Sequence, residues 1–214
     1  ATWAEQLIAG YETIRSVRCE IRREADSADG RSQGRGQWLS IVFFERPDHL
    51  HVRNSLPLKR LIVCDGKEFR SHVEGDRLGF ARPVDQLSED MLISLRQVPG
   101  TAMDHLLRLR SLPETRLPPA DPYSARYGYT ATNRFVVLSA DACNRLARVE
   151  VFGDSAMTNR LADYEYSLFV EARPGVWIPQ LHKGEARLGE ARVTTTVHID
   201  RLQVDAAIDP ALWQ

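Results

Sequence analysis

The sequence predicts a mainly β fold with a few helices (α+β), in which serially connected antiparallel strands form one strongly curled meander. Apolar residues near the N-terminus, in residues 2–17, follow a helical period. The period then changes to two, and two runs of strands, at residues 18–81 and 123–204, flank a short helical segment at 88–110. Because no composition shift divides the 214 residues, we expect a single domain over residues 1–214.

The predicted N-terminal helix is amphipathic, because its apolar residues recur at helical spacing and form one stripe. From Arg18 onward the residues alternate with a period of two, as in a strand, up to a polar turn at residues 26–30. The helical stripe comprises Trp3, Leu7, Ile8, Tyr11, Ile14 and Val17.

The strand predicted at residues 34–45 is apolar on both faces, so both faces should be covered, one of them by a helix. Pro47 cannot donate to a sheet ladder, so this strand should end with Arg46 beside it. Short strands follow at residues 49–53, 61–64, 68–73 and 77–81, and Asp65-Gly66 favours a tight hairpin turn. In the strand at residues 34–45, one face carries Trp38, Val42 and Phe44, and the other carries Leu39, Ile41 and Phe43.

The middle of the chain predicts two short helices. Ser88 is the expected N-cap of the first, which Pro99-Gly100 ends. Thr101 and Asp104 resemble a capping box that begins the second. Prolines between residues 113 and 122 predict a stiff surface crossing. The later strands are predicted at residues 123–130, 134–140, 146–152, 161–172, 176–188 and 191–204.

Charge and composition exclude several classes of function. Lys and Arg number 28 and Asp and Glu 29, for a net charge of -1, and the arginines are spread along the chain. A nucleic-acid groove or a polybasic membrane anchor needs a concentrated basic patch, so we expect neither. No apolar run approaches the ~18–20 residues of a membrane span, and no signal peptide begins at Ala1. Cys19, Cys64 and Cys143 leave open three free thiols or one disulfide.

No constellation of residues predicts catalysis, so we expect no enzyme, no metal and no cofactor. Gly34-Arg35-Gly36 is interpreted as a loop, and the surroundings of Ser155 do not form a nucleophile elbow. His49 and His51 share a strand face and could hold a metal, but without a third ligand the pattern favours paired solvent-facing histidines. Asp163 and Glu165 could act as an acid/base pair, yet exposed cross-strand charge pairs are favoured.

The two mid-chain helices carry more apolar surface than a simple sheet needs. They either plug the concave face as a core or form a movable lid over an acyl-chain site. Methionines adapt to both roles. The residues concerned are Met91, Leu92, Leu95, Met103, Leu106 and Leu107.

Several short motifs occur in an order typical of one family. They are Arg46-Pro47-Asp48 with Leu50, then Leu61-Ile62-Val63 with Asp65-Gly66-Lys67, then Val176-Trp177-Ile178-Pro179, and finally Leu202, Val204 and the closing Asp209-Pro210-Ala211-Leu212-Trp213. Together these motifs resemble the LolA-type outer-membrane lipoprotein carriers and their lipoprotein-sorting relatives, and the likeness covers most of the chain.

The resemblance implies an incomplete, strongly curved antiparallel β-barrel of about 10–11 strands, with the helices covering its concave face. It implies a periplasmic, non-catalytic chaperone that carries lipoprotein acyl chains, or related lipids, during outer-membrane lipoprotein sorting. Its partners would be those acyl chains, an inner-membrane releasing complex and an outer-membrane receptor, with no nucleic acid. We expect a monomer, and a lipid anchor before Ala1 stays open.

In this family an arginine at a strand end before proline hydrogen-bonds the lid helices and closes the empty cavity, and the resemblance places that role on Arg46. The alternative is an envelope-located sensor or protein-interaction module that has the same fold with a filled core. The expected latch and lipid-binding residues are Arg46, Leu50, Val42, Phe44, Met91, Leu92, Leu95, Met103 and Leu106.

Overall fold

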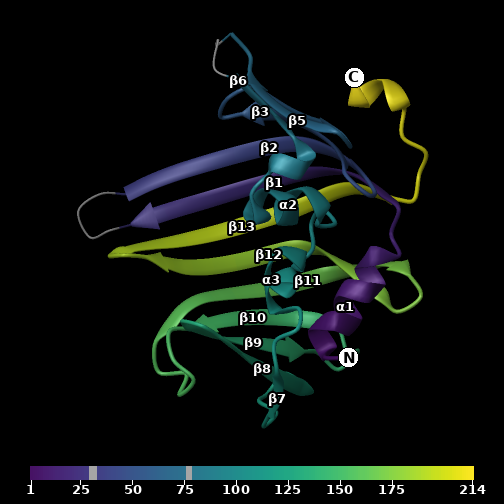
Figure 1. Ribbon diagram of the computed structural model, residues 1–214. Coiled ribbons are helices and arrows are strands. Elements are labelled where there is room, and N and C mark those ends of the chain that lie inside the picture. Colours follow the sequence, from purple (N-terminus) through teal and green to yellow (C-terminus); the bar gives the residue numbers. More distant parts are fainter. Residues whose placement is uncertain (29–32, 76–78) are drawn as a thin grey trace.

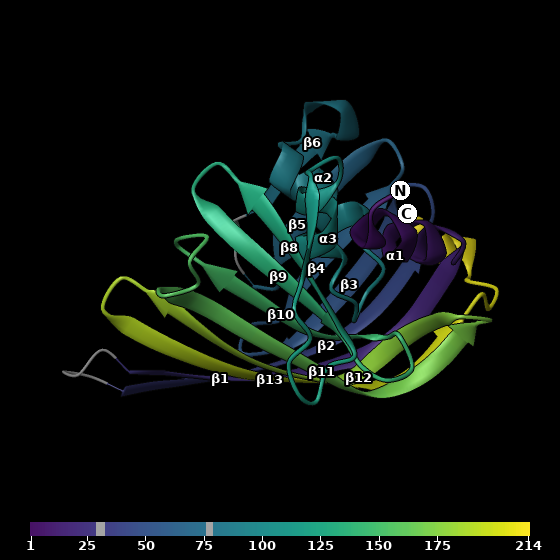
Figure 2. The same ribbon diagram turned by 90° about the horizontal axis from the view of Figure 1, so that it is seen from below.

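A computed structural model of the protein describes residues 1–28, 33–75 and 79–214. Across these residues thirteen antiparallel strands form one sheet that does not close on itself. The sheet curls into a trough, and the helices lie on its concave side (Figures 1 and 2). The predicted fold class is confirmed, although the described residues form more strands than the expected ~10–11.

The strand order shows how a meander becomes a trough. It runs β6-β5-β4-β3-β2-β1-β13-β12-β11-β10-β9-β8-β7, so the first strand pairs with the last and the two edge strands adjoin the helical insertion. The strands are β1 (Ser16–Ala28), β2 (Gln33–Glu45), β3 (His49–Leu56), β4 (Arg60–Asp65), β5 (Glu68–Val73), β6 (Gly79–Pro83), β7 (Glu114–Leu117), β8 (Ala125–Ala131), β9 (Arg134–Ala140), β10 (Leu146–Phe152), β11 (Arg160–Arg173), β12 (Val176–Leu188) and β13 (Ala191–Val204).

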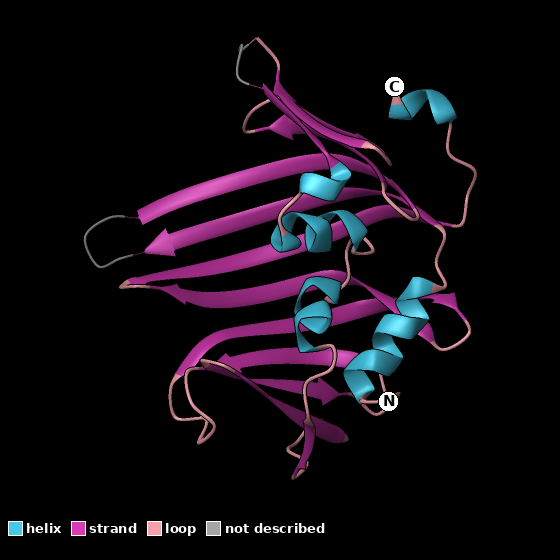
Figure 3. Cartoon of the chain, viewed as in Figure 1, coloured by secondary structure: helices cyan, strands magenta, loops and turns pink. Residues whose placement is uncertain are grey.

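The helices are few and short. Figure 3 shows α2 and α3 crossing the middle strands, with α1 beside them and the C-terminal turn at the far corner of the sheet. They are α1 (Trp3–Glu12), α2 (Glu89–Arg96) and α3 (Met103–Leu109), with 3₁₀ turns η1 (Val84–Gln86) and η2 (Pro210–Trp213).

The N-terminal helix is shorter than predicted. It begins with a capping box, in which Thr2 and Glu5 each accept the other's amide N–H, at 3.2 and 2.9 Å. It ends at Glu12, whereas the sequence predicted Val17. Ile14 and Val17 are fully buried, but Ile14 lies in the connection and Val17 in β1. Both are β-branched and suit extended backbone, so their spacing reflects burial and not a helix.

Three further predictions need correction. The proline-rich segment contains β7, which tolerates its flanking prolines because it is an edge strand. Thr101 is not the N-cap of α3, which is Ala102; its hydroxyl donates to the carbonyl of Val98 at 2.7 Å and accepts the amide N–H of Met103 at 3.4 Å. Gly34 and Gly36 lie in β2 and not in a loop.

Other local predictions are confirmed. The Ser88 hydroxyl accepts the amide N–H of Met91 at the start of α2. Asp65 accepts two amide N–H groups in the β4–β5 turn, and Gly66 has a φ of 84° there, which glycine adopts without strain. The predicted turn at 26–30 and strand at 77–81 fall partly outside the described residues, and their described parts belong to β1 and β6.

Candidate functional site

A strap of helices crosses the trough. We call α2, α3 and residues 97–102 between them the lid, and the concave face of the sheet the cradle. The chain enters the lid after β6 and leaves it toward β7, which are the two edges of the sheet (Figure 1). The lid therefore connects one edge to the other across the cradle, and both of its ends are fixed.

The lid meets the cradle through two clusters of apolar side chains. In the larger cluster, Met103 and Leu106 of α3 are buried together with Val42 and Phe44 of β2. In the smaller one, Leu95 is buried with Cys64. Leu50 borders both clusters, and Met91 and Leu92 pack against the smaller. Every apolar residue that the sequence assigned to a lipid site thus belongs to one of these two clusters or packs against one.

This interface is densely packed. Phe44, Leu95, Met103 and Leu106 are each no more than 1% exposed. Protein interiors of this kind leave few voids larger than a water molecule. Acyl chains could therefore reach these residues only if the lid moved away from the cradle.

Arg46 follows β2 at the predicted place, but it holds a different helix. Its Nε donates to the carbonyl of Ile14 at 2.9 Å and its Nη2 to that of Tyr11 at 3.3 Å. The guanidinium also lies 5.4 Å from the centroid of the Phe44 ring. Burial lowers the pKa of Arg46, although an arginine stays charged. Its hydrogen bonds go to the C-terminal end of α1, where a cation suits the helix dipole, and not to the lid as the resemblance implied.

The contact between this motif and the lid is made by Asp48, which sequence reasoning missed. Its two carboxylate oxygens accept from Nε and Nη2 of Arg96, in the last turn of α2, at 2.7 and 3.1 Å. The hydrogen bond with Asp48 raises the pKa of Arg96. The Asp48 side chain is 13% exposed and that of Arg96 is 49% exposed. Asp48 stands in the quoted motif, but its partner could not be chosen among the other cations without the fold.

Replacing Asp48 by Asn should loosen α2 without unfolding the sheet. A partly exposed bidentate ion pair contributes about 1 kcal/mol, so hydrogen exchange of the α2 amides should accelerate about fivefold. Asp200→Asn is the control, because it breaks an exposed pair with Arg22 between β13 and β1. Unchanged α2 exchange in Asp48→Asn would show that this ion pair does not hold the lid.

Next to the apolar clusters, the cradle contains a polar pocket of about 260 Å³ beneath the lid. Two histidines face it, His105 from α3 and His182 from β12. Sequence reasoning missed both, because only the strand order and the lid bring them together. The lid contributes Gln97, Thr101, Asp104 and His105, and the cradle contributes Arg23, Tyr164, Tyr166, His182, Gly184, Thr195 and Val197.

The paired histidines predicted on β3 are not solvent-facing. Leu50 points into the cradle, so His49 and His51 point to the outer face, where η2 covers them. His51 is 5% exposed, and its Nδ1 donates to the carbonyl of Leu212 at 2.9 Å. The His49 ring packs against Trp213. These histidines anchor the C-terminal turn.

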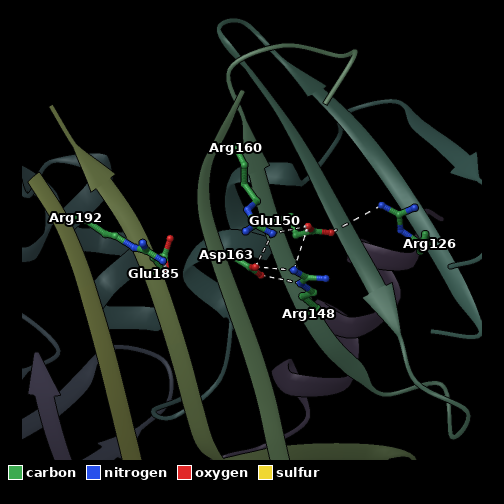
Figure 4. Close-up of polar contacts among 7 residues, drawn as sticks. All are labelled: Arg126, Arg148, Glu150, Arg160, Asp163, Glu185 and Arg192. Atoms are coloured by element: carbon green, nitrogen blue, oxygen red, sulfur yellow. Dashed lines mark hydrogen bonds and ion pairs between the residues drawn. The ribbon is translucent and has the colours of Figure 1, made fainter. Parts of the chain in front are cut away.

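Of the two acidic residues predicted as a pair on β11, Asp163 belongs to a charge network on the outer face (Figure 4), and Glu165 is not part of that network. Asp163 accepts from Arg148 at 2.6 and 2.7 Å and lies 2.9 Å from Arg160. Charge pairing is as expected, but Asp163 is only 17% exposed. Beside it, Glu150 lies 3.4 to 3.8 Å from three arginines and is 8% exposed. The network is therefore half-buried and internally paired.

The cysteines are free thiols, two of them buried. Burial raises the pKa of Cys19 to about 12, which keeps it protonated and unreactive at neutral pH. Within residues 1–28, 33–75 and 79–214, no three His, Cys, Asp or Glu side chains gather as metal ligands. None of the helices described there is both long and apolar enough to cross a membrane.

Three solved structures align with nearly the whole chain. A LolA superfamily protein from Nitrosomonas europaea has a TM-score of 0.59 at 12% identity, covering 100% of this chain and 98% of that chain. A DUF1329 family protein from Desulfovibrio piger has a TM-score of 0.58 at 11% identity, covering 99% and 94%. A domain named for outer-membrane lipoprotein sorting, from Vibrio parahaemolyticus, has a TM-score of 0.57 at 9% identity, covering 99% and 97%. The fold is that of the LolA superfamily.

The likeness is one of fold and not of sequence. A scan of protein-family models finds no match for the chain, and a search of curated proteins finds none either. The LolA-like architecture predicted from the motifs is confirmed, with the lid in the position that the resemblance implied for the covering helices.

Proposed function

We propose that this LolA-like protein is a periplasmic, non-catalytic carrier of lipoprotein acyl chains or related lipids. The observation that supports the proposal most directly is the lid, which meets the cradle through apolar side chains while both of its ends are tied to the sheet edges. Separating the lid from the cradle would open an apolar groove without unpairing any strand of the sheet.

In this mechanism acyl chains replace the lid's own side chains on the cradle floor. Val42, Phe44 and Leu50 would contact the chains from the cradle, and Met91, Leu92, Leu95, Met103 and Leu106 from the lid. Each buried CH₂ contributes about 0.8 kcal/mol, from which the cost of opening the lid is subtracted. Transfer to an outer-membrane receptor then needs only a competing site of comparable affinity.

A second function is favoured by the dense packing of the same interface. If the lid never leaves the cradle, its apolar residues are an ordinary core, and the protein is an envelope-located sensor or interaction module. Binding of an acyl probe separates these two functions, because a permanently filled core excludes it.

We expect the protein, purified from a bacterial envelope and extracted with organic solvent, to release near-stoichiometric acylated lipid that mass spectrometry detects. Arg46→Leu removes the hydrogen bonds to α1 and the contact with Phe44. It should raise the amount of lipid retained, because helices on the cradle could then move away from it.

Arg53→Leu is the matched control, since Arg53 is an exposed arginine on β3, and it should retain lipid as the wild type does. Lipid-free protein in all three forms, with no uptake of a fluorescent fatty acid, would refute the carrier and leave the interaction module.

A further inference from the structure

The polar pocket beneath the lid contains the only hydrogen bond, among the described residues, that joins the middle of the lid directly to the cradle floor. Nε2 of His182 lies 2.7 Å from the carbonyl oxygen of Gly100, so the ring donates its N–H there. Gly100 has a φ of 79° at the turn between α2 and α3, and a side chain there would meet Ile199 at 3.0 Å. The lid turn therefore lies directly on the cradle at this point.

His105 makes the complementary contact from the lid. Its ring lies 4.8 Å from that of Tyr164 on β11, and His182 in turn packs edge-on against Tyr166 at 4.9 Å. Both imidazoles thus lie between the lid and the floor, held against aromatic rings. Both rings are partly buried, and the His105 side chain is 23% exposed, so water could stabilise a charged ring only in part.

Few charged groups face these rings. From α3, Asp104 lies 3.8 Å from His105 and is the one carboxylate in the pocket lining, with Arg108 nearby on the same helix. From β11 come Tyr164 and Tyr166, and from β1 comes Arg23. Protonation of both histidines would add two positive charges to a site that has one carboxylate and two arginines. Little negative charge would therefore compensate them.

We propose that His105 and His182 make closure of the lid pH-dependent, holding the lid on the cradle while they are neutral and loosening it when they take up protons. This inference rests on the proposed function, because the purpose of a pH-dependent lid would be to admit acyl chains in an acidified envelope. Lid movement itself can be measured without any lipid.

The direction follows from the environment of the rings. Burial lowers the pKa of both histidines in the closed arrangement, although the hydrogen bond to Gly100 acts the other way on His182 and Asp104 does so on both. An open lid would return them to water and to an ordinary pKa of about 6.5. Closure is then fully favoured above about pH 6.5 and weakens as the pH falls toward the closed-state pKa values.

The test is hydrogen exchange of the lid amides of residues 98 and 100–107 in the full chain without lipid, at about pH 8, 6.5 and 5. Wild type is compared with the His105→Gln/His182→Gln double variant at each pH, so that intrinsic exchange cancels. His72→Gln, at an exposed position on β5, is the control. Lid opening in wild type relative to the double variant should rise as the pH falls, tenfold for each pKa unit between the open and closed states.

Asp104→Asn keeps both histidines and removes their counter-charge, so it should enlarge the acid effect. The same pH dependence in wild type and in the double variant would overturn the proposal, as would a smaller acid effect in Asp104→Asn. If the lid responds in this way but no acyl probe is taken up at any pH, the carrier fails and the pH-dependent lid stands.

Discussion

Replacing Phe44 by Ala should lower the free energy of unfolding by about 3–5 kcal/mol. The ring is completely buried in the largest apolar cluster, where the lid, α1 and the sheet meet. It also supports the guanidinium of Arg46, which lies over its face. Truncation removes the apolar contacts and leaves a cavity between elements that are fixed by the sheet and cannot collapse into it.

Denaturant unfolding of the two variants Phe44→Ala and Phe80→Ala measures this difference. Phe80 on β6 is 49% exposed and stacks on Phe69, so its loss should cost less than about 1 kcal/mol. A Phe44→Ala penalty as small as that of Phe80→Ala would mean that the lid is not packed on the cradle in solution. That result would contradict the closed interface between lid and cradle. It would also contradict the alternative function, which requires a filled core.

Sequence patterning predicted the sheet well because period-two alternation and turn residues are local signals. The strands β9, β10, β12 and β13 have the predicted bounds. Sequence patterning failed at Val17, where a buried strand residue happens to continue the helical spacing. It also failed in β7, an edge strand that is flanked by prolines. Both errors arise because tertiary contacts override local preference.

The candidate site divides in the same way. Apolar residues such as Phe44 and Leu95 could be assigned from spacing, since any element that covers a curved sheet must bury one face. The polar contacts could not. Asp48 meets Arg96, and His182 meets Gly100, across separations that only the strand order and the path of the lid create.

The charge network on the outer face could likewise not be predicted before the strand register was known. A substitution within it is expected to give the second large loss of stability. Glu150→Ala should lower the free energy of unfolding by about 3–5 kcal/mol, because it removes the anion that Arg126, Arg148 and Arg160 share and leaves Asp163 to pair with Arg148 and Arg160 alone. Val149 faces the core, so Glu150 projects to the opposite side, where neighbouring side chains cover it.

Figure 4 also contains the control for this change, the pair of Glu185 on β12 and Arg192 on β13. Both of those side chains are more than a third exposed, so Glu185→Ala should cost no more than about 1 kcal/mol. The two variants remove the same side chain from the same sheet, and only burial and the number of arginines left behind differ. Equal losses in urea unfolding would contradict the half-buried network. A Glu150→Ala loss that shrinks in high salt while that of Glu185→Ala stays small would instead identify repulsion among the three arginines as its cause.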